Sequence, residues 1–229
     1  MGSDRYRLVV FDWDGTLMDS EARIVDCLAQ AFIALGQVPP PAVVLKDVIG
    51  LGLLEAGRTL LPGADEPVVR TFIDHYRRAY LTGPNEGTVL FPGVIETLQR
   101  LADNDYLLAV ATGKSRRGLD RSLSESGCGA FFHVTRCADE ACSKPHPQML
   151  LEIMAVLDVE PRHTLVVGDT EYDVQMARNA GARAVAVEYG VHDRQRLLGH
   201  GALTSFSCII DLPRWLGITN VFEKGNTET

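Results

Sequence analysis

The chain is poor in positive charge. Lysine and arginine together number 22, against 30 aspartates and glutamates, and the formal net charge is −8. Nucleic acids and anionic membranes bind surfaces where basic residues cluster, so this balance argues against both as partners. An anionic substrate would need a local source of positive charge, either a metal ion or one of the few lysines. The chain has four lysines: Lys46, Lys114, Lys144 and Lys224.

Long apolar runs and ordered cysteine patterns are also missing. The first apolar run, residues 8–11, is too short for a signal peptide or a membrane span. Five cysteines, an odd number, form no C-x-x-C pair, and no His/Cys cluster completes a zinc site. We interpret them as reduced thiols and expect a cytoplasmic protein.

The hydrophobic pattern divides the chain into two kinds of sequence. Over residues 20–90, apolar positions recur at helical spacing in segments broken by Gly and Pro, which predicts a small all-helical unit. Elsewhere, apolar runs expected to be strands alternate with helical segments; these runs are residues 8–11, 107–111, 131–135, 165–167 and 184–187. This alternation predicts an α/β core with a parallel sheet, made of residues 1–19 and 91–229.

Two aspartates follow the first expected strand. Asp12 and Asp14 are separated by one residue, and Gly15 lets the backbone turn sharply after them. Adjacent carboxylates repel each other unless a cation neutralises them, so the pair suits a Mg²⁺ site in which one carboxylate attacks and the other transfers protons. An acidic turn after a strand explains this stretch equally well.

Other polar residues follow later strands or precede helices. Thr112 follows the run 107–111, Asp169 follows 165–167 with Asp173 one turn on, and Lys144 lies in a proline-flanked loop. Ligands of open α/β sheets bind at the carboxyl ends of the strands. Each residue has a simpler explanation, as a helix cap or a solvated charge. Four such loops meeting at one sheet edge favour a functional site.

These motifs resemble the signatures of one known family. The run DWDGTL at residues 12–17 resembles the first signature of the haloacid dehalogenase-like hydrolases, and ATG at 111–113, KP at 144–145 and GDT-x-x-D at 168–173 resemble the other three. The helical insert at 20–90 resembles the cap of the phosphoglycolate phosphatase-like branch. The resemblance implies a Rossmann-like parallel sheet flanked by helices, with an inserted all-helical cap domain.

The resemblance also implies a role for each core residue. Asp12 would be the nucleophile, and Asp14 would protonate the leaving alcohol and then activate water. Mg²⁺ would be held by the Asp12 side chain, the Asp14 backbone carbonyl and Asp169, with Asp173 supporting it directly or through water.

Residues that would bind the substrate follow from the same motifs. Thr112, Gly113 and Lys144 would bind the phosphoryl group, and Lys144 would also pair with Asp12. Arg116 and its neighbour Arg117 could meet a second anionic group of the substrate, or could simply be exposed arginines of a first helical turn. The loop at residues 49–53 is either a lid over the site or an interhelical turn.

Several alternatives within the family stay open or are disfavoured. Haloalkanoate dehalogenases lack an aspartate at the position of Asp14, so C–Cl hydrolysis is disfavoured. A phosphonatase would need a cap lysine, and Lys46 is more simply a solvated helix residue. A β-phosphoglucomutase-like mutase shares all four motifs, whereas a non-catalytic member would have lost some of these residues. We predict a Mg²⁺-dependent phosphatase, a monomer or homodimer, that hydrolyses a small phosphorylated metabolite such as phosphoglycolate or a sugar phosphate.

Overall fold

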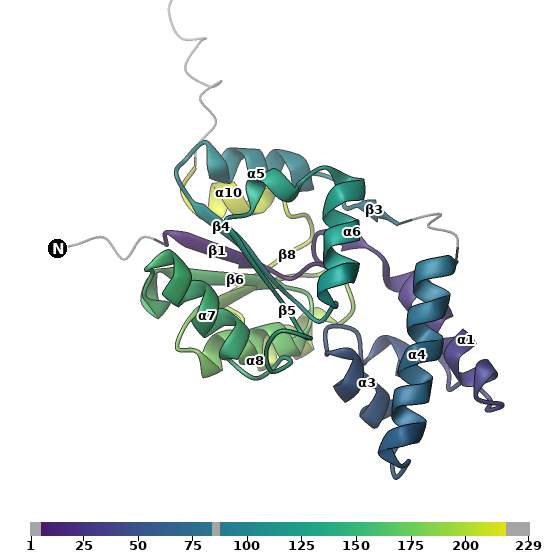
Figure 1. The fold of residues 1–229 in the computed structure, drawn as a ribbon. Coiled ribbons are helices and arrows are strands. Elements are labelled where there is room, and N and C mark those ends of the chain that lie inside the picture. The colour runs from purple at the N-terminus through teal and green to yellow at the C-terminus, as the bar shows by residue number, and fades with distance from the viewer. Residues whose placement is uncertain (1–5, 84–87, 219–229) are drawn as a thin grey trace, which may run out of the picture.

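The computed structural model describes residues 6–83 and 88–218. Its strands, in chain order, are β1 (Leu8–Phe11), β2 (Met18–Asp19), β3 (Val89–Leu90), β4 (Leu107–Thr112), β5 (Val134–Cys137), β6 (Thr164–Gly168), β7 (Arg183–Val187) and β8 (Ser205–Phe206). Within these residues, six strands form a parallel sheet in the order β5-β4-β1-β6-β7-β8 (Figure 1). β2 and β3 form a separate antiparallel ribbon.

Helices cover both faces of the sheet. They are α5 (Val94–Ala102), α6 (Arg116–Ser126), α7 (Gln148–Leu157), α8 (Glu171–Asn179), α9 (Arg194–Gly199) and α10 (Asp211–Trp215), with 3₁₀ turns at Gly129–Phe131 and Pro161–His163. Alternate residues of a strand point to opposite faces. Val9 and Phe11 of β1 therefore pack with α5, α6 and α10, while Leu8 and Val10 pack with α7, α8 and α9.

Four further helices lie beside the sheet and form a cap: α1 (Glu21–Ala34), α2 (Ala42–Lys46), α3 (Leu53–Leu60) and α4 (Glu66–Thr82) (Figure 1). They bury a hydrophobic core of their own, in which Phe32 of α1 and Phe72 of α4 meet edge to face with ring centroids 4.9 Å apart. The ribbon of β2 and β3 lies at the two chain connections between the cap and the sheet. The boundaries at residues 20 and 90 stay a prediction, and residues 84–87 lie outside the described ranges.

The structure confirms the parallel sheet and the inserted helical unit, with local corrections. The strand expected at residues 131–135 is present but begins later: Gly129–Phe131 forms a 3₁₀ turn, and β5 runs from Val134 to Cys137. Phe131 and Phe132 lie before the strand and pack against the hydrophobic core around α5 and α6. β8, α9 and α10 were not expected, because each is only two to six residues long and too short for a periodic pattern. Among the described helices, none has the length and apolar character needed to span a membrane.

Candidate active site

Three neighbouring strands end at the same edge of the sheet and bring polar residues together there. β1 lies between β4 and β6. Asp12 directly follows β1, Thr112 is the last residue of β4, and Asp169 directly follows β6. All three are at most 2% exposed. The expected convergence of these loops is confirmed.

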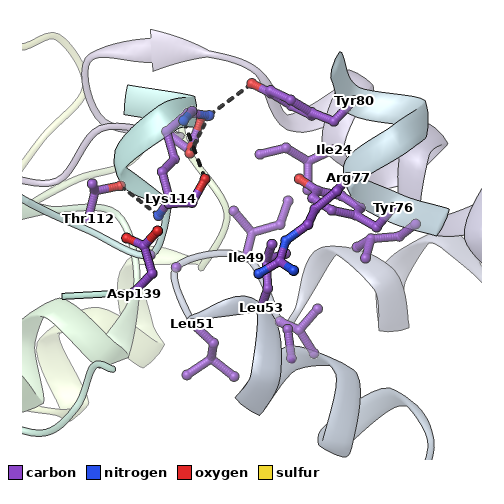
Figure 2. A pocket seen from close by; sticks show the side chains of 18 of the residues that line it. Ile24, Ile49, Leu51, Leu53, Tyr76, Arg77, Tyr80, Thr112, Lys114 and Asp139 are labelled. Atoms are coloured by element: carbon purple, nitrogen blue, oxygen red, sulfur yellow. Dashed lines mark hydrogen bonds and ion pairs between the residues drawn. The ribbon is translucent and has the colours of Figure 1, made fainter. Parts of the chain in front are cut away.

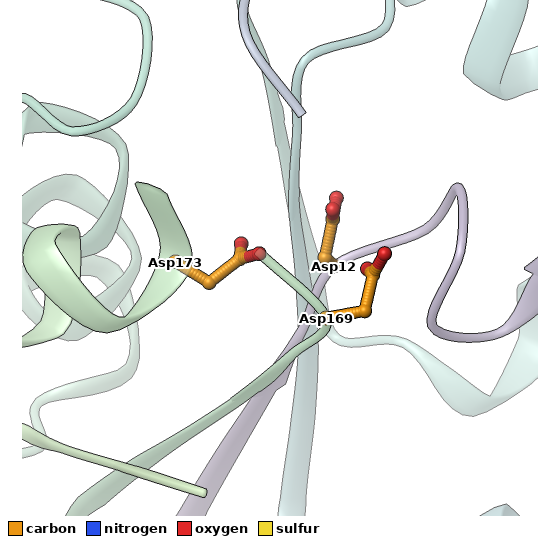
Figure 3. Close-up of side chains that lie close together, drawn as sticks. All are labelled: Asp12, Asp169 and Asp173. Atoms are coloured by element: carbon orange, nitrogen blue, oxygen red, sulfur yellow. The ribbon is translucent and has the colours of Figure 1, made fainter. Parts of the chain in front are cut away.

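Three buried carboxylates form a cluster at this edge. Oxygen atoms of Asp12, Asp169 and Asp173 lie within 4.8 Å of one another (Figure 3). Lys144 lies against the cluster: its ammonium is 2.7 Å from Asp12 Oδ1 and 2.6 Å from Asp173 Oδ1. Burial by itself would lower the pKa of Lys144, but the two carboxylates outweigh it and raise the pKa. Lys144 is therefore a buried, charged ammonium, and its expected pairing with Asp12 is confirmed.

Hydrogen bonds hold the two carboxylates that follow β6, Asp169 and Asp173, in place. Asp173 Oδ2 accepts hydrogen bonds from the Thr170 amide (3.1 Å) and hydroxyl (2.7 Å), which caps α8. Asp169 accepts bonds from the Thr16 hydroxyl (2.7 Å) and the Val191 amide (2.9 Å). Both oxygens of Asp173 therefore have protein partners: Oδ2 caps α8 through Thr170, and Oδ1 is paired with Lys144.

The backbone of the first motif approaches this cluster closely. A Cβ atom on Gly15 would lie 2.2 Å from Asp169 Oδ2, and Gly15 has a φ of +82°. The turn and the close approach both require glycine at this position.

The cluster fits a divalent cation. Asp12 Oδ2 is buried and has no hydrogen-bond partner among the described residues. Burial and, to a lesser extent, the charge of Asp173 together raise the pKa of Asp169 to about 7. Burial also raises the pKa of Asp12, an effect that Lys144 opposes and that Asp173 and Asp169 strengthen. Buried carboxylate oxygens are the ligands that hard cations prefer, and a cation here would stabilise their charged forms.

Asp14 lies apart from the cluster and faces a second lysine. Its Oδ1 and Oδ2 are 2.8 Å and 3.0 Å from the Lys114 ammonium, and the Ser20 hydroxyl donates to Oδ1 at 2.5 Å. Ser20 occupies the N-cap position of α1 but makes no capping bond, because its hydroxyl is directed to Asp14. Asp14 is therefore held by one residue of the core and one at the start of the cap.

Lys114 connects Asp14 to the cap. Its ammonium lies 2.8 Å from the hydroxyl of Tyr80 on α4, and the side chain is 7% exposed (Figure 2). Burial would lower the pKa of Lys114, but Asp14 and Tyr80 outweigh it and raise the pKa. No motif in the sequence predicted a role for Lys114. The scarcity of lysine and its position two residues after Thr112 were the signals that could have indicated one.

A cavity of about 320 Å³ lies between the sheet edge and the cap. Its core side includes Asp12, Asp14, Thr112, Gly113 and Lys114, and Figure 2 labels Thr112 and Lys114 there. Lys144, also expected to bind phosphate, is not among the lining residues and lies behind Asp12, to which it is paired.

The loop at residues 49–53 covers this cavity. A Cβ atom on Gly113 would lie 2.5 Å from the Leu51 carbonyl oxygen, and the Gly52 amide donates to the Ser143 hydroxyl at 2.6 Å. Residues 49 to 51 and Leu53 line the cavity. The loop thus lies over the core site, next to the residue that precedes Lys144.

The two adjacent arginines considered from the sequence, Arg116 and Arg117, differ in their relation to the cavity. Arg116 is not among the residues that line the cavity, and its guanidinium contacts Glu140 (2.9 Å), Asp120 (3.0 Å) and the Thr135 carbonyl (3.2 Å). Its donors are taken by acidic neighbours, so its contacts do not support substrate binding. Arg117 does line the cavity.

Lys46, the cap lysine that a phosphonatase would need, is 2.7 Å from Glu21 and also does not line the cavity.

Comparisons with known proteins agree with this geometry. A family model described as haloacid dehalogenase-like hydrolase matches residues 9–187. The chain belongs to this family. The matched range contains all four motifs and the whole helical insert, and it confirms the resemblance found in the sequence.

Curated relatives of this chain carry phosphatase names. The chain is 37% identical over 196 residues to "Probable phosphatase IndB" of Dickeya dadantii, covering 83% of this chain and 84% of the relative. It is 33% identical over 195 residues to a phosphoglycolate phosphatase of Pseudomonas putida, covering 80% and 70%. The fold matches a hydrolase from Pseudomonas syringae with a TM-score of 0.84, at 23% identity, over 92% of this chain and 97% of the other. The protein is accordingly an enzyme of the phosphatase class within this family.

Proposed function

We propose that the protein is a Mg²⁺-dependent phosphatase that hydrolyses a small phosphomonoester through a phosphorylated Asp12. The observation that carries this proposal is the state of Asp12. One of its oxygens is paired with Lys144, the other is buried and has no hydrogen-bond partner among the described residues, and Asp12 lines the cavity. A carboxylate with one unpartnered oxygen, on a residue that lines a cavity, suits attack on a phosphorus atom.

In the first step, a carboxylate oxygen of Asp12 forms a bond to phosphorus while the bond from phosphorus to the leaving oxygen breaks. The Thr112 hydroxyl, the Gly113 amide and the Lys144 ammonium would bind the phosphoryl oxygens and offset the charge that builds up on them. Because Lys144 is held by two carboxylates, it is positioned before the substrate arrives.

Asp14 would act as the general acid and base. It gives a proton to the leaving alkoxide, and it then takes a proton from the water that attacks the phosphorylated Asp12 and releases phosphate. Asp12 and Asp14 both line the cavity. The Asp14 carboxylate lies toward the cap, where it contacts Ser20 and Lys114.

Asp12, Asp169 and the backbone carbonyl of Asp14 would hold the Mg²⁺ ion. Asp173 would support the ion directly or through water, since one of its oxygens is already paired with the Lys144 ammonium. A bound Mg²⁺ ion would supply positive charge that offsets the negative charge developing on the phosphoryl group.

The substrate class we propose is a small phosphorylated metabolite, such as phosphoglycolate or a sugar phosphate. The names of the relatives and the cavity above Asp12 support it. The five cysteines are free thiols, in keeping with a reducing compartment, and we place the protein in the cytoplasm.

The test is phosphate release from a panel of phosphate esters, with Mg²⁺ and with EDTA, by the wild type and by Asp12→Asn. We expect release that needs Mg²⁺ and falls by about a thousandfold or more in the variant, since no nucleophile remains. Equal release by Asp12→Asn would contradict the proposal. Interconversion of sugar phosphates with little free phosphate would favour a mutase instead.

A further inference from the structure

The two sides of the cavity differ in chemistry. The core side carries carboxylates, a hydroxyl and an ammonium. The cap side is formed mostly by aliphatic and aromatic residues: Ile24, Leu28, Val48, Ile49, Leu53, Ala56, Tyr76, Tyr80 and Leu81. In Figure 2, the labelled cap residues lie across the cavity from Thr112 and Asp139 of the core. A phosphate bound above Asp12 would therefore direct its leaving group toward apolar side chains.

The cavity is also large for the smallest candidate substrate. Its volume is about 320 Å³, which lies within the roughly 300–1,000 Å³ of pockets that bind drug-sized ligands. Glycolate is a two-carbon acid and would occupy a small part of this space. It would also place a carboxylate near apolar walls, where an unpaired charge is costly.

The cap wall has little countercharge for such a group. Lys114 is already paired with Asp14, and Arg77, the cap cation at the cavity, is half-exposed and 3.3 Å from Asp74. Arg117 lies on the core side and is exposed. The cationic groups are thus either paired or near solvent, and the wall itself favours burial of apolar surface.

We infer that the leaving group of the physiological substrate is a bulky alcohol whose apolar body packs against the cap wall formed by α1, α3, α4 and the loop at residues 49–53. This inference rests on the proposed phosphatase function, and among small phosphorylated metabolites it favours esters of apolar alcohols over phosphoglycolate and sugar phosphates. Phosphoglycolate is then a poor substrate, and discrimination between esters comes from apolar contacts with the cap.

The test compares two esters that release primary alkoxides of similar reactivity, ethyl phosphate and 2-phenylethyl phosphate. They differ in the size of the apolar part of the leaving group. Phosphoglycolate is the third ester, and its leaving group carries a negative charge. We expect kcat/KM for 2-phenylethyl phosphate to exceed that for the other two esters by about tenfold or more, mainly through a lower KM. Equal kcat/KM for the two alkyl esters, or a preference for phosphoglycolate, would overturn the inference.

Two neighbouring leucines provide a matched pair of variants. Leu53 and Leu54 are both partly buried and both pack against the hydrophobic core of the cap, but of the two only Leu53 lines the cavity. Leu53→Ala should raise KM for 2-phenylethyl phosphate by about fivefold and change that for ethyl phosphate by less than about twofold. Leu54→Ala should leave the ratio of the two KM values unchanged. Equal effects of the two variants on this ratio would also overturn the inference.

Failure of the inference and failure of the proposed function give different results. Mg²⁺-dependent release from ethyl phosphate that Asp12→Asn abolishes, with no preference for the larger ester, overturns the inference alone. No release from any of the three esters overturns both.

Discussion

The two sides of the cavity are built by different means. On the core side, buried charged groups are held by specific partners, as Lys144 is by Asp12 and Asp173. On the cap side, apolar side chains are held by the packing of α1 to α4, with few polar contacts into the cavity. The difference indicates that reactivity and selectivity have separate structural sources in this enzyme. A change on one side should leave the other function largely intact.

Polar contacts nevertheless cross between the two sides. Tyr80 of the cap reaches Lys114 of the core, and the Gly52 amide of the cap loop reaches Ser143. Tyr172 of α8 donates to the Asp47 carbonyl at 2.9 Å, and Arg196 of α9 pairs with the Asp47 carboxylate. Of these contacts, the one through Lys114 leads to a residue that we assign to the chemistry, Asp14.

The largest effect should come from the core side, with Lys144→Met. This change leaves the Asp12 and Asp173 carboxylates buried without their shared cation. Removing one partner of a buried ion pair costs about 3–5 kcal/mol of stability, and the phosphoryl group loses a cation in the transition state. We expect kcat to fall by about a thousandfold and the urea midpoint of unfolding to decrease.

Lys46→Met is the control for this change. Lys46 is about one-third exposed, pairs with Glu21 in the cap and lies outside the cavity. It should cost less than about 1 kcal/mol and leave kcat unchanged. If Lys46→Met lowered kcat as much as Lys144→Met, the division between core chemistry and cap packing would be wrong.

A smaller effect should follow from Lys114→Met, which removes the link between the two sides. Asp14 would lose its ion pair and with it a fixed position, so we expect kcat to fall by about 10- to 100-fold while KM changes little. Tyr80→Phe removes one hydrogen bond to Lys114 and keeps the ring, and it should lower kcat only about threefold. A change confined to KM in both variants would show that Lys114 binds substrate and does not position Asp14.

The carboxylate cluster should make stability depend on pH and metal together. The pKa of Asp169 is about 7 in the folded protein, against an ordinary value of 3.8. Between these values the folded state binds more protons than the unfolded chain, so the metal-free protein should lose stability as pH rises from about 4 to about 7.

Mg²⁺ should reverse this loss, because it binds the charged carboxylates. At about a hundredfold excess over its Kd, Mg²⁺ should raise Tm by about 5–10 °C at pH 8 and by less at pH 5. Thermal melts of the wild type and of Asp169→Asn would measure both effects, and both should be smaller in the variant, in which the buried Asp12 carboxyl still titrates. An equal Mg²⁺ shift at both pH values in the wild type would contradict the proposed site.

Most of the core side could be predicted from the sequence, because local signals specify it. A buried strand followed by Asp12 and Gly15 fixes the direction of the carboxylate and the turn after it. The capping box of α8 fixes Asp173 within the same few residues. The strand-helix alternation then brings these short motifs to one edge of the sheet.

The cap side could not be predicted in the same way. Tyr80 lies 34 residues from Lys114 in sequence, and Ser143 lies 91 residues from Gly52. Such contacts depend on how the cap packs against the sheet, and no local pattern encodes that. For the same reason the sequence did not distinguish Arg116 from Arg117, which are adjacent on the first turn of α6.

The smallest effect should separate these two arginines. Arg116 forms exposed contacts with Glu140 and Asp120, each worth about 0.2–1 kcal/mol, and it lies outside the cavity. We expect Arg116→Gln to leave kcat/KM unchanged and to lower Tm by a few degrees at most. Arg117→Gln should leave Tm unchanged and raise KM about two- to threefold, because Arg117 lines the cavity and adds positive charge near an anionic ester. Added salt should weaken the Arg117 effect, since an exposed charge is screened. A rise in KM for Arg116→Gln and not for Arg117→Gln would show that Arg116, and not Arg117, is the arginine that meets the substrate.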